Sequence, residues 1–452
     1  MLNFLLSVIG LGLIFLLKEY SAILVSIGFG LIGFIISDWL IPRVGQSFIK
    51  IGLFGIDLSK PGKPIIPESI GAVTATVYIF TMLFCIPFLF YKDMVVTTSG
   101  GGNRDLSIDE STSNLAGSFF PHNKLSEFLS SLLCLETTVM IGIADDLFDL
   151  RWRHKFFLPA IAAIPLLIVY YVDFGVTYVL VPNFMQYWLN GKKYVNLGSF
   201  YYVYMAAMSI FCPNSINILA GVNGLEVGQS IVLGVLALIN DFLYLTVGPE
   251  LSHEAHTLSV IIIIPFIGVS FALWKWNRWP ARVFVGDTYC YFAGMVFAVV
   301  GILGHFSKTM LLIFIPQILN FIYSCPQLFH IVPCPRHRLP KFNEADGLLY
   351  PSRANLVDEP PKKFFVPILK FLHFFKLSHL EFVDEMKKDQ IKSCTNMTFI
   401  NLILVWFGPM REDKLCNRIL QLQFLIGILA IFVRHIIGVL LFGTDNLHPI
   451  VK

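Results

Sequence analysis

The 452-residue sequence has few charged side chains. Only 14% of its residues are Asp, Glu, Lys or Arg, whereas 56% are hydrophobic and the mean hydropathy is +0.70. An ordinary soluble domain carries about 25% charged residues. The scarcity of charge excludes that class and predicts a chain that crosses a lipid bilayer several times.

Other absences narrow the function further. The net charge is only +3 and the basic residues are spread over several loops, so we expect no nucleic-acid partner. The eight cysteines include no CxxC pair and predict no disulfide scaffold or common zinc site. The chain has no GxxxxGK[ST] segment, which excludes a P-loop nucleotidase.

The pattern of apolar runs predicts an all-α, polytopic membrane protein. Ten runs are long enough to cross about 30 Å of hydrocarbon. They lie near residues 22–42, 71–91, 127–144, 156–173, 200–216, 228–247, 258–274, 288–304, 309–332 and 420–442. The shorter run 4–17 is an uncleaved anchor, an eleventh helix or an extension of the first helix. Residues 397–407 are too short to span, and we expect them at the interface or folded against the bundle.

The distribution of basic residues predicts the orientation. Connections after odd-numbered crossings carry 21 of the 33 lysines and arginines, and those after even-numbered crossings carry six. The positive-inside rule therefore places the odd side in the cytosol. We divide the chain into a hydrophobic segment (1–20), a transmembrane core (21–332), a cytosolic loop (333–396), and an interfacial segment with the last transmembrane helix (397–452).

Every polar cluster of candidate catalytic or ligand-binding residues falls on this odd side. The clusters are GIDLSKPGKPIIPES (55–69), GIADDLFDLRWRHK (142–155), NSINILAGVNGLEVGQ (214–229), RVFVGDT (282–288) and PCPRHRLP (333–340). Because chance would scatter such clusters over both sides, their agreement predicts one composite site at the cytosolic membrane surface.

Asp145 and Asp146 lie where an apolar run ends. Adjacent carboxylates repel each other, so they either face water as a solvated helix end or share a cation. The basic residues that follow, up to Lys155, would also suit simple anchoring at lipid headgroups. Glu136, inside the apolar run, either faces the bundle interior or has a functional role.

Amides and another carboxylate add oxygen donors. Asn214 and Asn217 would share one helix face, and the AGVNG segment allows the backbone to approach a ligand closely. Turn and capping chemistry is the alternative for these asparagines and for Asn223. Asp287 precedes an apolar run, so it is either a helix N-cap or a catalytic carboxylate.

These donors, together with fixed cations, predict diphosphate chemistry. Arg336, His337 and Arg338 in one short loop suit phosphate oxygens. Oxygen donors with few sulfur or imidazole groups favour Mg²⁺ or Mn²⁺, and Mg²⁺ typically takes one or two protein ligands plus substrate phosphates. We therefore expect phosphoryl transfer that depends on a divalent cation.

Five long motifs in a fixed order carry a family resemblance. They are IDLSKPGKPIIPESIG, GIADDLFDLRWRHKFFLPA, NSINILAGVNGLEVGQS, VFVGDTYCYFAGM and SCPQLFHIVPCPRHRLP. With these motifs the chain resembles the polyprenyl-phosphate N-acetylhexosamine-1-phosphate transferases over residues 43–345, with a weaker similarity over residues 396–413. The CPRHR loop is similar to that of the eukaryotic branch, whose donor is UDP-GlcNAc and whose acceptor is dolichyl phosphate.

The resemblance implies a reaction and a place. GlcNAc-1-phosphate would pass from UDP-GlcNAc to dolichyl phosphate, giving dolichyl-diphosphate-GlcNAc and UMP, as the first step of N-glycan precursor synthesis. The enzyme would be a multi-pass protein of the endoplasmic reticulum membrane with a cytosolic active site, and the nucleoside antibiotic tunicamycin would bind it. The lipid bilayer is a further expected partner, and a homodimer is compatible with the resemblance.

The resemblance also implies roles for residues. Asn217 and Asp287 would hold Mg²⁺ against the diphosphate. Phe284 and the Ala220–Gly224 turn would enclose uracil, whose edge would be bonded by Asn223 and the Leu58 backbone. The remaining expected substrate-binding residues are Glu68, Asn214, Gly221, Arg336, His337 and Arg338.

Asp145, Asp146 and Lys155 would form the catalytic group. One aspartate would orient or deprotonate the lipid phosphate and the other would support Lys155 or the metal, and the assignment stays open. A phosphate monoester, with a second pKa of about 6, is largely ionised near neutral pH, so a strong general base is not required. Direct attack by the lipid phosphate needs fewer steps than a covalent aspartyl-phosphate intermediate, and we favour it, with Asp145 as the positioning group or base. A transporter of lipids or sugar nucleotides, or a silent partner subunit, is the alternative function.

Overall fold

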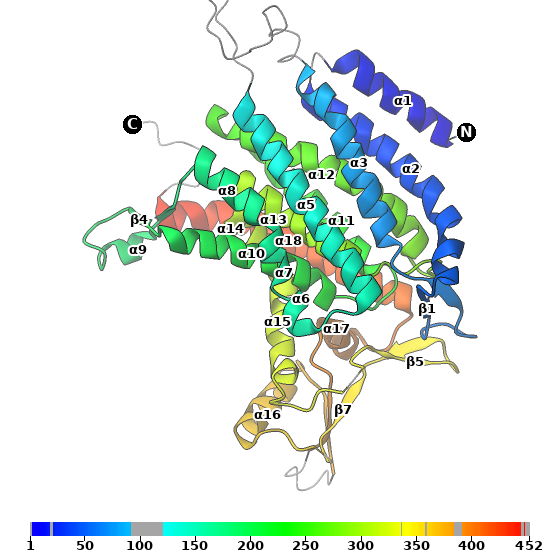
Figure 1. Cartoon of the computed structure of the whole chain (residues 1–452). Coiled ribbons are helices and arrows are strands. Elements are labelled where there is room, and N and C mark those ends of the chain that lie inside the picture. Colours follow the sequence, from blue (N-terminus) through cyan, green and yellow to red (C-terminus); the bar gives the residue numbers. More distant parts are fainter. Residues whose placement is uncertain are drawn as a thin grey trace, which may run out of the picture.

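A computed structural model describes residues 2–18, 21–91, 121–335, 337–357, 359–383, 391–443 and 447. Its long helices form one bundle, and the segment from β5 to α17 projects from one end of it (Figure 1). The helices of ten or more residues are α1 (Leu2–Leu17), α2 (Ala22–Lys50), α3 (Gly71–Leu89), α5 (His122–Phe148), α8 (Ile164–Asp173), α10 (Ser199–Ile218), α11 (Leu225–Val247), α12 (Glu250–Asn277), α13 (Asp287–Leu303), α15 (Ile315–Leu328) and α18 (Glu412–Phe442).

Shorter helices connect these elements. They are α6 (Trp152–Lys155), α7 (Leu158–Ala162), α9 (Asn183–Gln186), α14 (Ser307–Ile313), the 3₁₀ turn η2 (Lys363–Phe365), α16 (Val366–Phe374) and α17 (Phe399–Phe407). Among the described residues, seven helical stretches are long and apolar enough to cross a bilayer, and the bent pair α14–α15 would make an eighth. The chain is therefore a mostly helical, multi-pass membrane protein. The predicted crossings at α10 and α13 are helical too but fall outside this count, and α13 has 17 residues.

The predicted single helix over 309–332 is wrong. The chain bends by 66° between α14 and α15. Pro316 lies in the first turn of α15, where proline is tolerated because the first N–H groups of a helix have no intrahelical partner. The segment therefore begins a new helix at Ile315 rather than continuing the old one.

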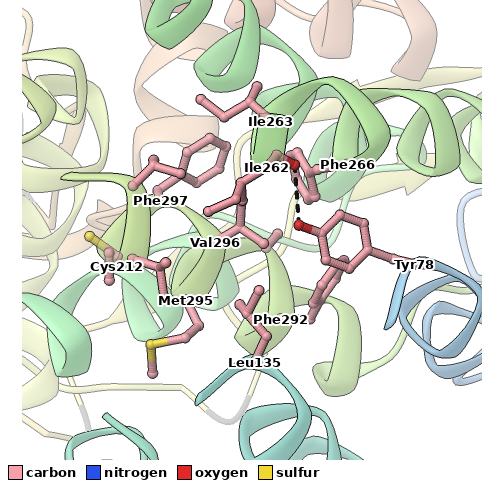
Figure 2. Packing of buried hydrophobic residues seen from close by; sticks show 14 of the residues in the cluster. Tyr78, Leu135, Cys212, Ile262, Ile263, Phe266, Phe292, Met295, Val296 and Phe297 are labelled. Carbon is pink, nitrogen blue, oxygen red and sulfur yellow. Dashed lines mark hydrogen bonds between the residues drawn. The ribbon is translucent and has the colours of Figure 1, made fainter. Parts of the chain in front are cut away.

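Helix α13 lies in the middle of the bundle. Every residue from Thr288 to Leu303 is buried, as expected of a helix that is apolar on all sides. Figure 2 shows Phe292, Val296 and Phe297 packed against residues of α12, with Tyr78 of α3 alongside. The Tyr78 hydroxyl donates a hydrogen bond of 3.1 Å to the Ile262 carbonyl, which satisfies the one polar atom of this buried ring.

Glycines let α13 approach its neighbours. A Cβ added at Gly294 would lie 2.3 Å from the Pro213 Cα of α10, and one at Gly142 would lie 2.6 Å from the Thr288 Cα. Small residues allow such close backbone contacts between membrane helices. The contact at Gly142 brings the end of α5, with its aspartate pair, against the start of α13.

The description as all-α omits nine short strands found within the described ranges. Three antiparallel pairs are β1 (Phe54–Ile56) with β2 (Ile65–Pro67), β3 (Tyr178–Leu180) with β4 (Tyr194–Asn196), and β5 (Lys341–Asn343) with β6 (Leu348–Tyr350). A three-stranded sheet has the order β7 (Arg353–Asn355), β9 (Ile391–Thr395), β8 (Leu380–Phe382). All of them lie in connections outside the long helices, where the sequence has no helical apolar period.

Two segments left open by the sequence are placed by packing. Residues 2–17 form helix α1, which packs against α2. A Cβ at Gly28 would come within 2.7 Å of the Gly10 carbonyl oxygen, so the two helices touch through backbone. Helix α17 is largely buried and packs against α15 and α18, which confirms that residues 397–407 fold against the bundle.

Candidate active site

Lys155 joins two carboxylates at one end of the bundle. Its Nζ lies 2.9 Å from Asp145 Oδ2 and 2.8 Å from Asp287 Oδ2. The Asp145 side chain is 1% exposed, and its Oδ1 also accepts the Leu150 backbone N–H at 3.0 Å. The end of α5, the short helix α6 and the start of α13 therefore meet at one cation.

Asp146 bonds the first residues of α13 and not Lys155. Its Oδ1 accepts the Asp287 backbone N–H at 2.8 Å, and its Oδ2 accepts the Thr288 N–H at 3.3 Å and the Thr288 hydroxyl at 2.5 Å. The first N–H groups of a helix have no intrahelical acceptor, and a carboxylate there also interacts favourably with the helix dipole. Asp146 thus caps α13 from another helix. Asp287 is the first residue of α13 and not its N-cap, and its carboxylate bonds Lys155.

Two asparagines of α10 lie close to this group. The Asn217 side-chain amide lies near the Asp287 carboxylate. Asn214 Nδ2 donates to the Ile210 carbonyl at 2.7 Å and to the Phe156 carbonyl at 3.3 Å. Asn217 is therefore the amide next to the candidate metal ligand, whereas Asn214 ties α10 to the chain just after Lys155.

Asp287 and Asn217 provide the oxygen donors that a hard cation prefers. Among the described residues, no group of three or more His, Cys, Asp or Glu side chains could hold a metal ion. This donor set fits a cation with few protein ligands, of the kind Mg²⁺ forms when phosphates and water complete its coordination. It does not fit a structural zinc site.

The hairpin formed by β1 and β2 connects this centre to a second group of residues. A Cβ at Gly55 would lie 2.7 Å from Phe284 Cδ2 and 3.4 Å from Glu68 Oε2. The Phe284 N–H donates to the Pro67 carbonyl at 2.8 Å. Phe284 and Glu68 therefore both lie against Gly55 of the hairpin, and Leu58, in the hairpin loop, is 66% exposed.

Glu68 is affected by the aspartates of the first group. Removal of water by surrounding protein atoms, followed by the negative charges of Asp146 and Asp287, raises the pKa of the Glu68 carboxyl above its usual range. A cation bound between these carboxylates would reverse the effect of the charges.

The turn before α11 holds Asn223 in a buried polar cluster. Its backbone N–H donates to Glu412 Oε1 at 2.9 Å, and its Nδ2 lies 2.9 Å from Asp57 Oδ2. Lys60 lies 3.3 Å from Asp57 and forms an ion pair with Glu412. The turn is further held by Glu226, whose Oε1 accepts the Gly221 N–H at 2.7 Å.

The C-terminal loop reaches the same turn. A Cβ at Gly221, where φ is +103°, would lie 2.3 Å from Leu339 Cδ2. His337 is exposed, and Arg338 is partly buried, with an Nη1 that has no hydrogen-bond partner among the described residues. Arg336, the third member of the predicted anion-binding triplet, lies outside the described residues.

An apolar cavity of about 790 Å³ ends beside the aspartate pair. Its walls come mainly from α2 and α3, and Asp146, Leu147 and Thr288 line it where α5 meets α13.

The interpretation that Glu136 faces the bundle interior is wrong, because its side chain is exposed on the outer surface of α5.

The sequence is similar to those of known proteins. Residues 128–305 match the family model "Glycosyl transferase family 4". The UDP-N-acetylglucosamine--dolichyl-phosphate N-acetylglucosaminephosphotransferase of Saccharomyces cerevisiae is 70% identical over 427 residues, which cover 94% of each chain. The chain belongs to this phosphotransferase family.

Other members of the family match over most of their length as well. The phosphotransferase of the same name from Schizosaccharomyces pombe is 50% identical, with 96% of this chain and 97% of that protein covered. The one from Dictyostelium discoideum is 38% identical, with 88% and 85% covered. Membership of this phosphotransferase family favours the enzyme over the transporter considered as an alternative.

Three residues of the candidate site were not predicted from the sequence. Asp57 and Lys60 lie inside the quoted IDLSKPGKP motif, but only Leu58 was selected from that loop. Glu412 begins α18 and lies within the weaker similarity over residues 396–413, which yielded no predicted site residue. An acid at the start of an apolar helix was a second signal.

Proposed function

We propose that this phosphotransferase moves GlcNAc-1-phosphate from UDP-GlcNAc to dolichyl phosphate on the cytosolic face of the endoplasmic reticulum membrane, as the first step of N-glycan precursor synthesis. The names of the relatives supply the two substrates. The observation that carries the proposal is the meeting of Asp145, Lys155, Asp287 and Asn217 at one end of the bundle.

The reaction is a single displacement at phosphorus. An oxygen of the dolichyl phosphate attacks the β-phosphorus of UDP-GlcNAc, the bond from that phosphorus to the bridging oxygen breaks, and UMP leaves with the electron pair. The attacking phosphate is largely ionised, given a second pKa of about 6. No strong base is required, so Asp145 acts by holding Lys155 toward the phosphates.

Mg²⁺ held by Asp287 and Asn217 would neutralise charge that develops on the diphosphate oxygens. Lys155 adds a positive charge within the same group, and preorganised charge of this kind is a large part of phosphoryl-transfer catalysis. Arg338, with its unpaired Nη1, and the exposed His337 would bind the diphosphate and the sugar from the other side.

The donor base would lie between Phe284 and the Ala220–Gly224 turn, beside Asn223 and the Leu58 backbone. Tunicamycin, as a nucleoside, would compete for the same place. We further propose ten crossings, with α10, α13 and the bent α14–α15 pair added to the remaining spans. This arrangement puts the site on the side with the most lysine and arginine.

The test is transfer of radiolabelled GlcNAc-1-phosphate from UDP-GlcNAc to dolichyl phosphate by the purified protein in detergent. We expect labelled lipid and UMP with Mg²⁺, no product after excess chelator, and recovery when Mg²⁺ is returned. UDP-GalNAc in place of UDP-GlcNAc is the matched control for the sugar. An unlabelled lipid in every arm, with intact and folded protein, would contradict the proposal.

A further inference from the structure

Two carboxylates hold the side-chain amide of Asn223 in one orientation. Its Nδ2 lies 2.9 Å from Asp57 Oδ2 and 3.4 Å from Glu412 Oε2. An ionised carboxylate has no hydrogen to donate, so the amide nitrogen and not the amide oxygen must face both. Oδ1, which can only accept, is then the side-chain atom of Asn223 that is left for a ligand.

Glu412 also fixes the backbone of the turn. Its Oε1 accepts the Asn223 N–H at 2.9 Å while its Oε2 pairs with Lys60. Asp57, through its other oxygen, accepts the Ser59 N–H at 3.0 Å and so shapes the loop that carries Leu58. The cluster of Asp57, Lys60, Asn223 and Glu412 therefore positions both the Asn223 side chain and the Leu58 backbone. These are the two groups beside the proposed base site.

The cluster is buried. Asp57, Lys60, Asn223 and Glu412 are 3%, 8%, 6% and 4% exposed. Buried ionic groups of this kind contribute little to stability compared with well-packed apolar side chains, and their best-attested use is to specify one geometry among several. A stabilising role alone is a weak explanation for two acids and one lysine in this position.

We infer that Glu412 is a positioning residue that makes the site selective for uracil over cytosine. The inference rests on the proposed function, which places the donor base beside Asn223. Uracil carries a hydrogen on N3, which Oδ1 of Asn223 can accept. Cytosine has a lone pair at N3, so two acceptors would face each other and neither would be satisfied. A site built around such a bond rejects the wrong partner by about 10²-fold or more.

The test compares binding of UMP and CMP. Each nucleotide is titrated calorimetrically into the purified full-length protein in detergent with Mg²⁺. We expect the wild type to bind UMP about 10²-fold more tightly than CMP. In Glu412→Gln, the new amide can donate to Oδ1 of Asn223 and release the fixed orientation, so the ratio should fall at least tenfold. Glu412→Asp, which keeps the charge and both acceptors, should recover part of it.

Asp413→Asn is the matched control. Asp413 is the next residue in the first turn of α18, and its carboxylate pairs with Arg411 at 2.6 Å rather than with the Asn223 turn. The ratio should stay at the wild-type value in this variant. In transfer assays, Glu412→Gln should raise KM for UDP-GlcNAc with a smaller effect on kcat, because the base lies away from the reacting phosphorus.

Two results would overturn the inference. One is equal affinity of the wild type for UMP and CMP, and the other is an unchanged ratio in a folded Glu412→Gln protein. Should that variant fail to fold, Asp57→Asn tests the other carboxylate with the same expected loss of selectivity. A wild type that prefers UMP but transfers no GlcNAc-1-phosphate would contradict the proposed function and leave this inference standing.

Discussion

The Asp146 carboxylate accepts the backbone N–H of Asp287 at 2.8 Å, so one member of the aspartate pair supports the start of the helix that carries the candidate metal ligand. Asp145, its neighbour, bonds Lys155 instead. Adjacent in sequence, the two residues point to different partners because consecutive side chains on a helix lie on different faces. Asp146 therefore positions the start of α13, and Asp145 positions the Lys155 ammonium group.

Asp146→Asn should weaken both stability and turnover. An amide cannot accept with both of its polar atoms, so the variant loses at least one of the bonds to Asp287 and Thr288. Loss of a helix cap costs about 1 kcal/mol. We expect a lower melting temperature and weaker Mg²⁺ binding. We also expect kcat to fall by about tenfold or more, since small displacements of reacting groups have large effects on rate.

The control for that variant is Asp149→Asn. Asp149 is exposed and follows the same helix, where its φ of +48° suits Asn as well as Asp. A loss of turnover in Asp149→Asn equal to that in Asp146→Asn would contradict the role assigned to Asp146.

Gly142→Ala should disturb the site without changing any polar group. The added Cβ would lie 2.6 Å from Thr288 Cα, so α13 must shift. Overpacking of this kind costs about 1–3 kcal/mol. We expect turnover to fall by about tenfold to a hundredfold while the protein remains folded, as measured by transfer assays and thermal unfolding.

Gly12→Ala adds the same methyl group to helix α1, where no atom of a neighbouring described residue lies within 4 Å of the new Cβ. It should leave turnover unchanged and raise stability slightly, because Ala is the better helix former. Equal effects of the two substitutions would show that close packing of α5 against α13 is not what matters.

Asp287→Ala and Asp145→Asn should separate binding from turnover. Removal of the candidate ligand Asp287 should weaken Mg²⁺ and UDP-GlcNAc binding by about 10²-fold or more. Asp145→Asn should lower kcat by about 10²-fold, because Lys155 would be positioned less well, yet retain UDP-GlcNAc affinity within a few-fold, as titration calorimetry would measure. Equal loss of nucleotide affinity in both variants would contradict this division.

Glu68 should make stability depend on pH. Because its pKa is raised in the folded protein, the unfolded chain loses the proton first as pH rises, and folding then becomes less favourable. The penalty begins near the ordinary value of 4.5 and is complete above the raised value. Glu68→Gln should therefore match the wild type in melting temperature at low pH and exceed it at neutral pH.

Added Mg²⁺ should remove most of that difference in the wild type, because a cation beside Asp287 favours the ionised Glu68. Thermal unfolding at several pH values, with and without Mg²⁺, provides the measurement. A constant difference between wild type and Glu68→Gln across pH would refute the explanation.

Long apolar runs made most of the helices predictable from sequence. A run of about 20 apolar residues has few alternatives to a membrane helix, since each backbone group must be satisfied internally. The break before Ile315 and the strands between residues 341 and 395 were not predicted. Both depend on local backbone conformation and pairing partners, which hydropathy does not report.

The candidate site, like the fold, was predicted from the sequence only in part. Asp145, Lys155, Asn217 and Asp287 came from motifs whose residue types indicate chemistry, and the structure brings them together. The different roles of Asp145 and Asp146 could not be foreseen, because they depend on which helix each side chain meets. Glu412 was missed because its partner Asn223 is 189 residues away.

The position of Glu412 also sets the order in which the enzyme becomes competent during its synthesis. Every other member of the buried cluster is translated and inserted long before α18 leaves the ribosome. Until α18 docks, Lys60 and the Asn223 turn lack their shared acceptor, and the proposed nucleotide site stays incomplete. A nascent chain halted before Glu412 would therefore neither bind nor sequester sugar nucleotide, and substrate would stabilise only chains whose last long helix has been inserted.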